Sequence, residues 1–205
     1  EWFGKDDWEV YRNRRDINWQ DYEYFAENIN GAESVCPTVG TSAVVNYQDF
    51  TSENIPVFGT TEEYQRTLGL DVDEGRFFTK RESDGGWGVC VIGYDIKESF
   101  FQNIDPIGKV IQVDGHNFKV IGTYEKMGSM LGLFSLDNRI IIPINKFFKM
   151  FGTRRSLTIN VKAPTVEALE DTKEESRAVM KRARRIPIGG KDDFGVNQQE
   201  AFKQT

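Results

Sequence analysis

The side chains that could support catalysis or bind a metal ion are sparse in this chain and lie far apart. His116 is the only histidine among 205 residues, and it follows an Asp-Gly pair with no serine, cysteine or carboxylate motif directed at it. A histidine acid–base pair or a histidine-centred metal site needs partner groups at suitable spacing. The sequence therefore predicts no catalytic residue, no cofactor and no metal, and we do not expect an enzyme.

The two cysteines, Cys36 and Cys90, have no Cys-x-x-Cys or Cys/His spacing typical of a zinc site. Two interpretations stay open. They are two buried thiols, because isolated cysteines behave as small apolar side chains. Otherwise they form a disulfide, which needs an oxidising compartment and Cα atoms within about 7 Å of each other.

Two other patterns resemble ligand sites but lack their defining features. The glycines at 85–88 precede an apolar strand, whereas a dinucleotide-binding loop follows a strand and opens a helix, so we expect a turn. The nearby acidic residues lack the ligand spacing of a calcium loop and are expected to be solvated. These acidic residues are Asp71, Asp73, Glu74, Glu82 and Asp84.

Basic side chains close a predicted helix that begins with acidic ones. Stabilisation of the helix dipole explains this order, and contact with an acidic partner or anionic lipid head groups is the alternative. The basic residues are Lys181, Arg182, Arg184 and Arg185.

A methionine-containing apolar segment is neither helical in its spacing nor cleanly alternating. It packs under a sheet, or it is an exposed loop, since flexible Met-rich surfaces are typical of protein contacts. On the second interpretation the candidate partner-contact residues are Met127, Met130, Leu131, Leu133 and Phe134.

Composition narrows the class of protein. The net charge of -6 and the pI of about 5.0 disfavour nucleic acid as a partner, because a phosphate backbone would be repelled by most of the surface. No apolar run approaches the roughly 18 residues of a membrane-spanning helix, and the mean hydropathy is -0.52. With Glu1 in place of a start methionine, we expect a water-soluble piece of a longer protein.

The first part of the chain has a strand–helix–strand pattern. Residues 8–13 are predicted to form a strand, and Asn18 caps a helix with Phe25 on its apolar face. Gly31 ends this helix, and residues 34–47 are extended.

The last part of the chain repeats this pattern. Leu157, Ile159 and Val161 alternate with polar residues, a helix follows over 166–184, and residues 194–197 are extended. Two βαβ units commonly share one sheet. We therefore expect residues 1–48 and 150–205 to form one lobe, with residues 49–149 inserted as a mainly-β lobe in an α+β fold.

The middle of the chain consists of short strands and turns. Asp114-Gly115 is a two-residue hairpin signal, which would place Ile111 opposite Phe118 and Val113 opposite His116. A short helix with Ile96 and Phe100 on one face is expected after a strand at 89–92.

Five short motifs follow one another in this region, and their order is more informative than any one of them. Together they resemble the extracytoplasmic core domain of MacB-like ABC transporter permeases, over about residues 8–200. The motifs are Gly75-Arg76-Phe77-Phe78, Val91-Ile92-Gly93, Asp105-Pro106-Ile107-Gly108-Lys109, Phe118-Lys119-Val120-Ile121-Gly122 and Ile142-Pro143.

The resemblance implies a porter-like lobe of two βαβ units and a function in coupling. Such a domain lies on the periplasmic side of the inner membrane, between two membrane helices, and transmits the effect of cytoplasmic ATP hydrolysis mechanically. Its implied partners are an ATP-binding subunit or domain, a second copy of the permease, and a periplasmic adaptor or lipoprotein. A peptide- or lipid-binding extracytoplasmic domain is the alternative function, and a stand-alone enzyme is the third.

Overall fold

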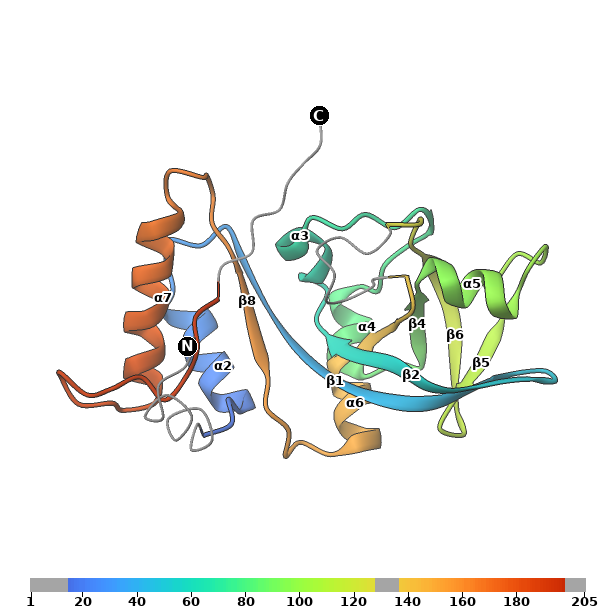
Figure 1. The fold of residues 1–205 in the computed structure, drawn as a ribbon, viewed down its shortest axis with the longest axis horizontal. Coiled ribbons are helices and arrows are strands. Elements are labelled where there is room, and N and C mark those ends of the chain that lie inside the picture. Colours follow the sequence, from blue (N-terminus) through green and yellow to red (C-terminus); the bar gives the residue numbers. More distant parts are fainter. Residues whose placement is uncertain (1–14, 128–136, 198–205) are drawn as a thin grey trace, which may run out of the picture. The chain divides into compact units, whose positions relative to one another are not determined.

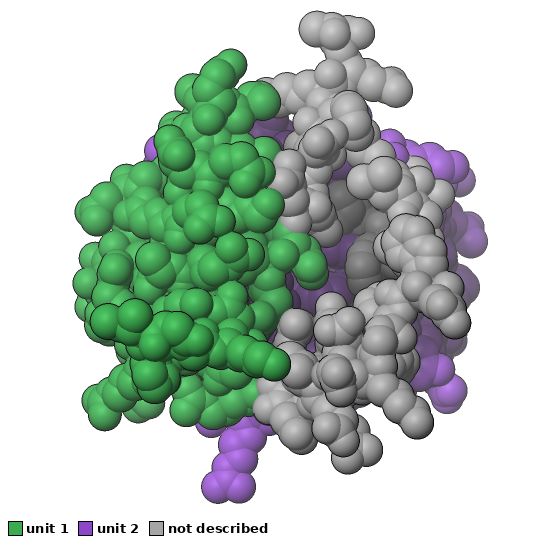
Figure 2. Space-filling view, turned by 60° about the vertical axis from the view of Figure 1, so that its left-hand side comes forward, with its two compact units in different colours: residues 1–33, 163–205 green, residues 34–162 purple. Residues whose placement is uncertain are grey.

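The computed structural model describes residues 15–127 and 137–197, and its fold is α+β. Contacts divide the chain into two compact units, residues 34–162 and residues 1–33 with 163–205 (Figure 2). The first unit contains every assigned strand of the described residues. The contacts thus group residues 34–48 and 150–162 with the middle of the chain, and the predicted porter-like lobe stays a prediction.

The strands of the first unit form a closed sheet with the order β2-β7-β4-β6-β5-β1-β8 (Figure 1). β3 pairs with β6 off this path, and an additional pairing between β1 and β2 closes it. The strands are β1 (Ser34–Tyr47), β2 (Phe50–Thr60), β3 (Glu74–Gly75), β4 (Val89–Ile92), β5 (Val110–Val113), β6 (His116–Thr123), β7 (Ile140–Pro143) and β8 (Thr158–Lys162).

The β5–β6 hairpin confirms the register expected from the sequence. Ile111 pairs with Phe118, and Val113 pairs with His116. Asp114 and Gly115 have φ angles of 45° and 77°. Positive φ at both turn residues matches the twist of the flanking strands, so this short loop fixes which side chains face the core.

Four short helices accompany the described strands of this unit. The expected helix after β4 is confirmed as α5, with Ile96 and Phe100 buried. On β2, a Cβ at Gly59 would lie 2.6 Å from the Cβ of Phe147 in α6, so that contact requires a glycine. The helices are α3 (Tyr64–Leu68), α4 (Lys80–Gly85), α5 (Tyr94–Phe100) and α6 (Ile144–Phe151).

Glu82 in α4 is buried, so the prediction that this carboxylate is solvated was wrong. It accepts two hydrogen bonds of 2.8 Å from the Arg76 guanidinium and one from the Thr79 backbone N–H. Thr79 and Glu82 form a capping box at the start of α4. The bonds from Arg76, followed by those from Thr79, lower the pKa of Glu82 to about 2 despite its burial.

The second unit contains α2 (Trp19–Asn28) and α7 (Leu169–Ala183), which contact each other. Asn18 caps α2 as expected, through a capping box with Asp21. The Glu175 carboxylate of α7 accepts the backbone N–H groups of Asn30 and Gly31 at 2.8 and 2.7 Å, which fixes the end of α2 against α7. The expected strand at 8–13 lies outside the described residues, and 194–197 is not assigned as a strand.

Arg184 is a buried part of this unit rather than a member of an exposed basic cluster. Its side chain is fully buried and forms ion pairs with Asp193 at 2.7 Å and Asp21 at 3.4 Å. It also donates to the backbone carbonyl oxygens of Arg15 and Asp16. A charge in this position is costly unless its partners remain, so Arg184 links the end of α7 to the start of α2.

Glu82 gives a prediction for stability against pH. Because its folded pKa is lowered, its contribution is present above the unfolded value of about 4.5 and is lost as the pH falls towards about 2. Glu82→Gln should reduce the free energy of unfolding at pH 7 by about 1–3 kcal/mol. Denaturant titrations should show this difference shrinking by pH 3. Glu98→Gln, an exposed control on α5, should change little; an equal effect of both variants would contradict the assignment.

Arg184→Leu should destabilise the second unit, because Asp21 and Asp193 would lose their buried partner. We expect a loss of about 3–5 kcal/mol in the free energy of unfolding. Arg182→Leu, two residues earlier and exposed, is the control and should stay within about 0.5 kcal/mol of the parent chain. Thermal and denaturant unfolding measure both, and equal stability of the two variants would rule out the proposed link.

Candidate partner-contact site

The predicted partner-contact segment joins the end of β6 to the start of β7. Of its five candidate residues, the structure describes Met127 alone. Met130, Leu131, Leu133 and Phe134 lie outside the described residues. The described residues on either side of residues 128–136 form two stems. The first stem ends at Met127, and the second begins at Asp137.

The first stem ends at Met127, which is half-buried against an apolar cluster of the sheet unit. Aromatic stacking organises this cluster, with ring centroids 4.1 Å apart for Phe77 and Phe78 and 6.1 Å apart for Tyr64 and Phe77. Its buried members are Cys36, Tyr64, Leu70, Phe77, Phe78, Val89, Val91, Ile121, Tyr124 and Ile141. Met127 thus contributes to packing, and because it is only half-buried it can also contact a partner.

The second stem begins at Asp137, whose side chain joins the two stems. Asp137 is buried, and its Oδ1 accepts the backbone N–H of Met127 at 2.8 Å. The Asp137 carbonyl oxygen accepts the Asp95 N–H at 2.9 Å. The Arg139 carbonyl oxygen accepts the Gly93 N–H, also at 2.9 Å. Both bonds attach the second stem to the start of α5. The two stems are therefore joined to each other and to the sheet unit.

Arg139 completes this second stem. It is 8% exposed, and its guanidinium carbon lies 4.8 Å from the centre of the Phe58 ring on β2. A cation over an aromatic face is stabilised by the ring quadrupole. Sequence reasoning overlooked both Asp137 and Arg139. The available signal was two charged residues directly before the apolar run that forms β7.

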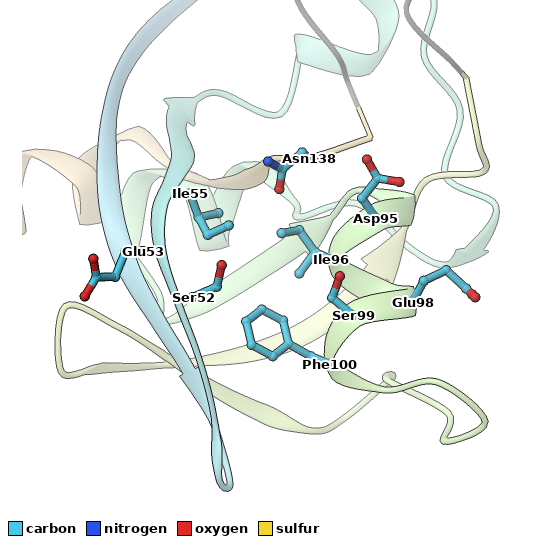
Figure 3. A pocket seen from close by; sticks show the side chains of 9 residues that line it. All are labelled: Ser52, Glu53, Ile55, Asp95, Ile96, Glu98, Ser99, Phe100 and Asn138. Carbon is cyan, nitrogen blue, oxygen red and sulfur yellow. The ribbon is translucent and has the colours of Figure 1, made fainter.

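A pocket of about 420 Å³ lies beside the second stem, between β2 and α5. Three carboxylates lie on its margin, but Figure 3 shows Glu53 and Glu98 pointing away from each other. They do not converge as the ligands of a cation would. The pocket is lined by Ser52, Glu53, Ile55, Asp95, Ile96, Glu98, Ser99, Phe100 and Asn138. It also lacks the mostly apolar lining typical of a peptide or lipid site.

The remaining candidates for chemistry are separated in the structure. Cys36 and Cys90 are free buried thiols, so the disulfide interpretation was wrong. Burial raises the pKa of Cys36 to about 11 and raises that of Cys90 as well. The ring Nδ1 of His116 lies 3.1 Å from the Asp114 carbonyl oxygen on the hairpin surface. Residues 15–127 and 137–197 contain no group of three metal-ligating side chains.

Within residues 15–127 and 137–197, no helix is long and apolar enough to cross a bilayer.

The fold is found in solved structures of transporter domains. It matches the extracellular domain of the ABC-type transporter YknZ from Gram-positive bacteria with a TM-score of 0.69 and 22% identity, covering 89% of each chain. It also matches the periplasmic region of MacB from Actinobacillus actinomycetemcomitans, with a TM-score of 0.67 and 20% identity, over 87% and 80% of the two chains.

Sequence comparison identifies the family. The pyoverdine export ATP-binding/permease protein PvdT of Pseudomonas aeruginosa is 30% identical over 174 residues, which are 84% of this chain and 26% of that protein. The macrolide export protein MacB of Bdellovibrio bacteriovorus is 24% identical, over 92% of this chain and 29% of that protein. This chain thus spans about a quarter of these relatives. The model of the MacB-like periplasmic core domain matches residues 3–179, and the chain belongs to this family.

Proposed function

We propose that this chain is the periplasmic domain of an ABC export permease and couples cytoplasmic ATP hydrolysis mechanically to an extracytoplasmic partner or substrate. The observation that carries the proposal is the family match over residues 3–179, together with relatives named as export ATP-binding/permease proteins. On this proposal the domain lies outside the inner membrane, and ATP is hydrolysed in another domain or subunit reached through membrane helices.

A coupling domain must transmit displacement, and the geometry of the sheet unit supports this role. Closely packed cores and closed sheets deform little, so a displacement at one side is passed on rather than absorbed. Here the stems of residues 128–136 are bonded to each other and to α5. A partner that contacts the segment would therefore be linked to the whole sheet unit.

The lobe organisation is part of the proposal. We place residues 1–48 and 150–205 in a porter-like lobe of two βαβ units, with residues 49–149 as the inserted lobe. Support comes from β8, which pairs only with β1 among the described strands, so its other edge is open to a further strand. It also comes from the order in the chain, where α2 precedes β1 and α7 follows β8.

We assign the partner contact to Met127, Met130, Leu131, Leu133 and Phe134. The proposed partners of the complete transporter are the ATP-binding part, a second copy of the permease, and a periplasmic adaptor or lipoprotein. Coupling requires that a partner binds with different affinity in the two nucleotide-dependent states, because equal affinity would shift no equilibrium.

The proposed contact predicts loss of transport without loss of ATP hydrolysis. In the full-length transporter, we expect serine at Met130, Leu131, Leu133 and Phe134 to lower export about tenfold, because the apolar contact that binds the partner is removed. The basal ATPase rate in detergent should stay within about twofold. Full export by this variant in cells would exclude an interface at the segment, and absence of ATP-dependent export by the parent protein would exclude the proposed function.

Asp137 predicts a positioning effect that is separable from stability. Asp137→Ala removes the acceptor for the Met127 N–H, whereas Asp137→Asn keeps an oxygen that can accept it. Export should therefore fall about tenfold for Asp137→Ala and recover in part for Asp137→Asn. The neighbouring exposed residue provides a control, Asn138→Ala, which should export normally. Melting curves accompany each assay, and equal export by all three variants would contradict the role of Asp137.

A further inference from the structure

A second pocket, of about 290 Å³, lies on the sheet unit where β1, β5 and β6 run side by side (Figure 1). Three carboxamide side chains, one from each strand, form a row across it. Asn46 of β1 pairs directly with Gln112 of β5, and Gln112 pairs directly with Asn117 of β6. Directly paired residues have their side chains on the same face of a sheet. We call Asn46, Gln112 and Asn117 the amide row.

The amide row lies on the solvent side of the sheet. Val45 and Val113 pair next to it and have no exposed surface. Successive side chains of a strand point to opposite faces, so the row points away from the core that these valines enter. Asn46 is half-buried, and the other two amides are exposed. A dissolved ligand can therefore reach all three side chains.

Hydrogen bonds within the β1–β2 hairpin orient two of the amides that line the pocket. Thr51, opposite Asn46 on β2, donates from Oγ1 to Asn46 Oδ1 at 2.7 Å. The Asn46 amino group thus keeps its two N–H donors for another partner. Gln48 donates from Nε2 to the Tyr47 hydroxyl at 3.4 Å, which leaves Gln48 Oε1 as an acceptor. The Tyr47 ring is fixed in turn by Phe101, with ring centroids 4.5 Å apart.

The lining of this pocket combines many hydrogen-bonding groups with an absence of charge. Each carboxamide presents an oxygen that accepts and an amino group that donates two hydrogen bonds. Val110, which is 50% exposed, adds one apolar contact. Charged residues make up 28% of the chain, yet among the described residues no acidic or basic side chain lines the pocket. The lining residues are Asn46, Tyr47, Gln48, Val110, Gln112 and Asn117.

This lining disfavours three classes of ligand. An ionic ligand would lose hydration without gaining an opposite charge. A nucleobase needs an exposed aromatic ring to stack on, whereas Tyr47, the aromatic residue of the lining, is only 7% exposed. A peptide strand needs an open edge, and both β1 and β5 are paired on both sides at this point. A neutral ligand rich in hydroxyl groups fits, because hydroxyls both donate and accept as carboxamides do.

We propose that this pocket binds a neutral sugar ring, either free or at the end of a glycan. The amide row provides donors and acceptors for the ring hydroxyls, and Val110 provides a contact for the C–H groups of the ring. The volume is near the lower limit of about 300 Å³ for small-molecule sites, so it suits one ring. The inference goes beyond the proposed function and does not rest on it, because every lining residue belongs to the sheet unit.

NMR tests the site directly, because carboxamide NH₂ groups give signals of their own. The isotope-labelled chain is titrated with cellobiose and with diacetylchitobiose, two neutral disaccharides, and in parallel with glucuronate and with trialanine. We expect a neutral disaccharide to shift the NH₂ signals of the amide row, with a dissociation constant in the millimolar range. Retention of the chain on cellulose or chitin beads would identify a glycan as the source of the ring. Binding of the disaccharide without retention would identify a free sugar.

Two substitutions examine the roles of single side chains. Gln112→Ala removes the central amide and should weaken sugar binding about fivefold to tenfold, as expected for a lost hydrogen bond. Gln20→Ala, at an exposed glutamine of α2, is the matched control and should bind like the parent chain. Thr51 is a positioning residue, so Thr51→Val should weaken binding about threefold and Thr51→Ser, which keeps the hydroxyl, should restore it. Melting curves should be the same for all four variants.

Three outcomes would overturn the proposal. The first is that neither disaccharide shifts the signals of the amide row. The second is a larger response to glucuronate or to trialanine, which would identify an anionic or a peptide ligand. The third is equal sugar affinity of Gln112→Ala and the parent chain. The export assays described above decide the proposed function separately, since none of these titrations depends on ATP hydrolysis or transport.

Discussion

The sheet unit depends on the pairing of one long strand, β1, with three others. Its 14 residues pair with β2 over most of their length, with β8 at the start and with β5 at the end. The register with β2 shifts between Ala43 and Val45, which is where a bulge lets a long strand bend. Without this bend and the pairing to both β2 and β5, the sheet could not close, and the cluster beneath β4 and β6 would be exposed.

Closure also imposes a cost on folding. β2 and β7 are parallel neighbours, with Val57 opposite Ile140, although more than one third of the chain separates them. Such pairing must wait until the intervening strands and helices have collapsed, because the entropy of closing a long loop is lost first. Asp137 and Arg139 lie directly before β7, so we expect the stems of residues 128–136 to be assembled late.

Local signals predicted the elements whose structure is determined within a few residues. The Asp114-Gly115 pair fixed a hairpin register, and Asn18 marked the start of α2. Glu82 was misjudged, and the burial of Arg184 was not predicted, for a common reason. Charged residues are usually solvated, and their burial here depends on partners that the fold brings close, such as Asp21 for Arg184. The spacing of residues in the sequence also did not show which carboxylate accepts the Met127 backbone N–H. That carboxylate belongs to Asp137, ten residues further along the chain.

The two buried thiols limit when this chain is vulnerable to oxidants. Cys36 belongs to β1 and Cys90 to β4, and both have no exposed surface once the sheet has formed. A cysteine thiolate can attack the disulfide of an oxidising catalyst only while it is exposed to that catalyst. In an oxidising compartment, the rate of sheet closure therefore competes directly with the rate of mispairing. The yield of correctly folded domain would depend on these two competing rates rather than on the redox stability of the folded structure.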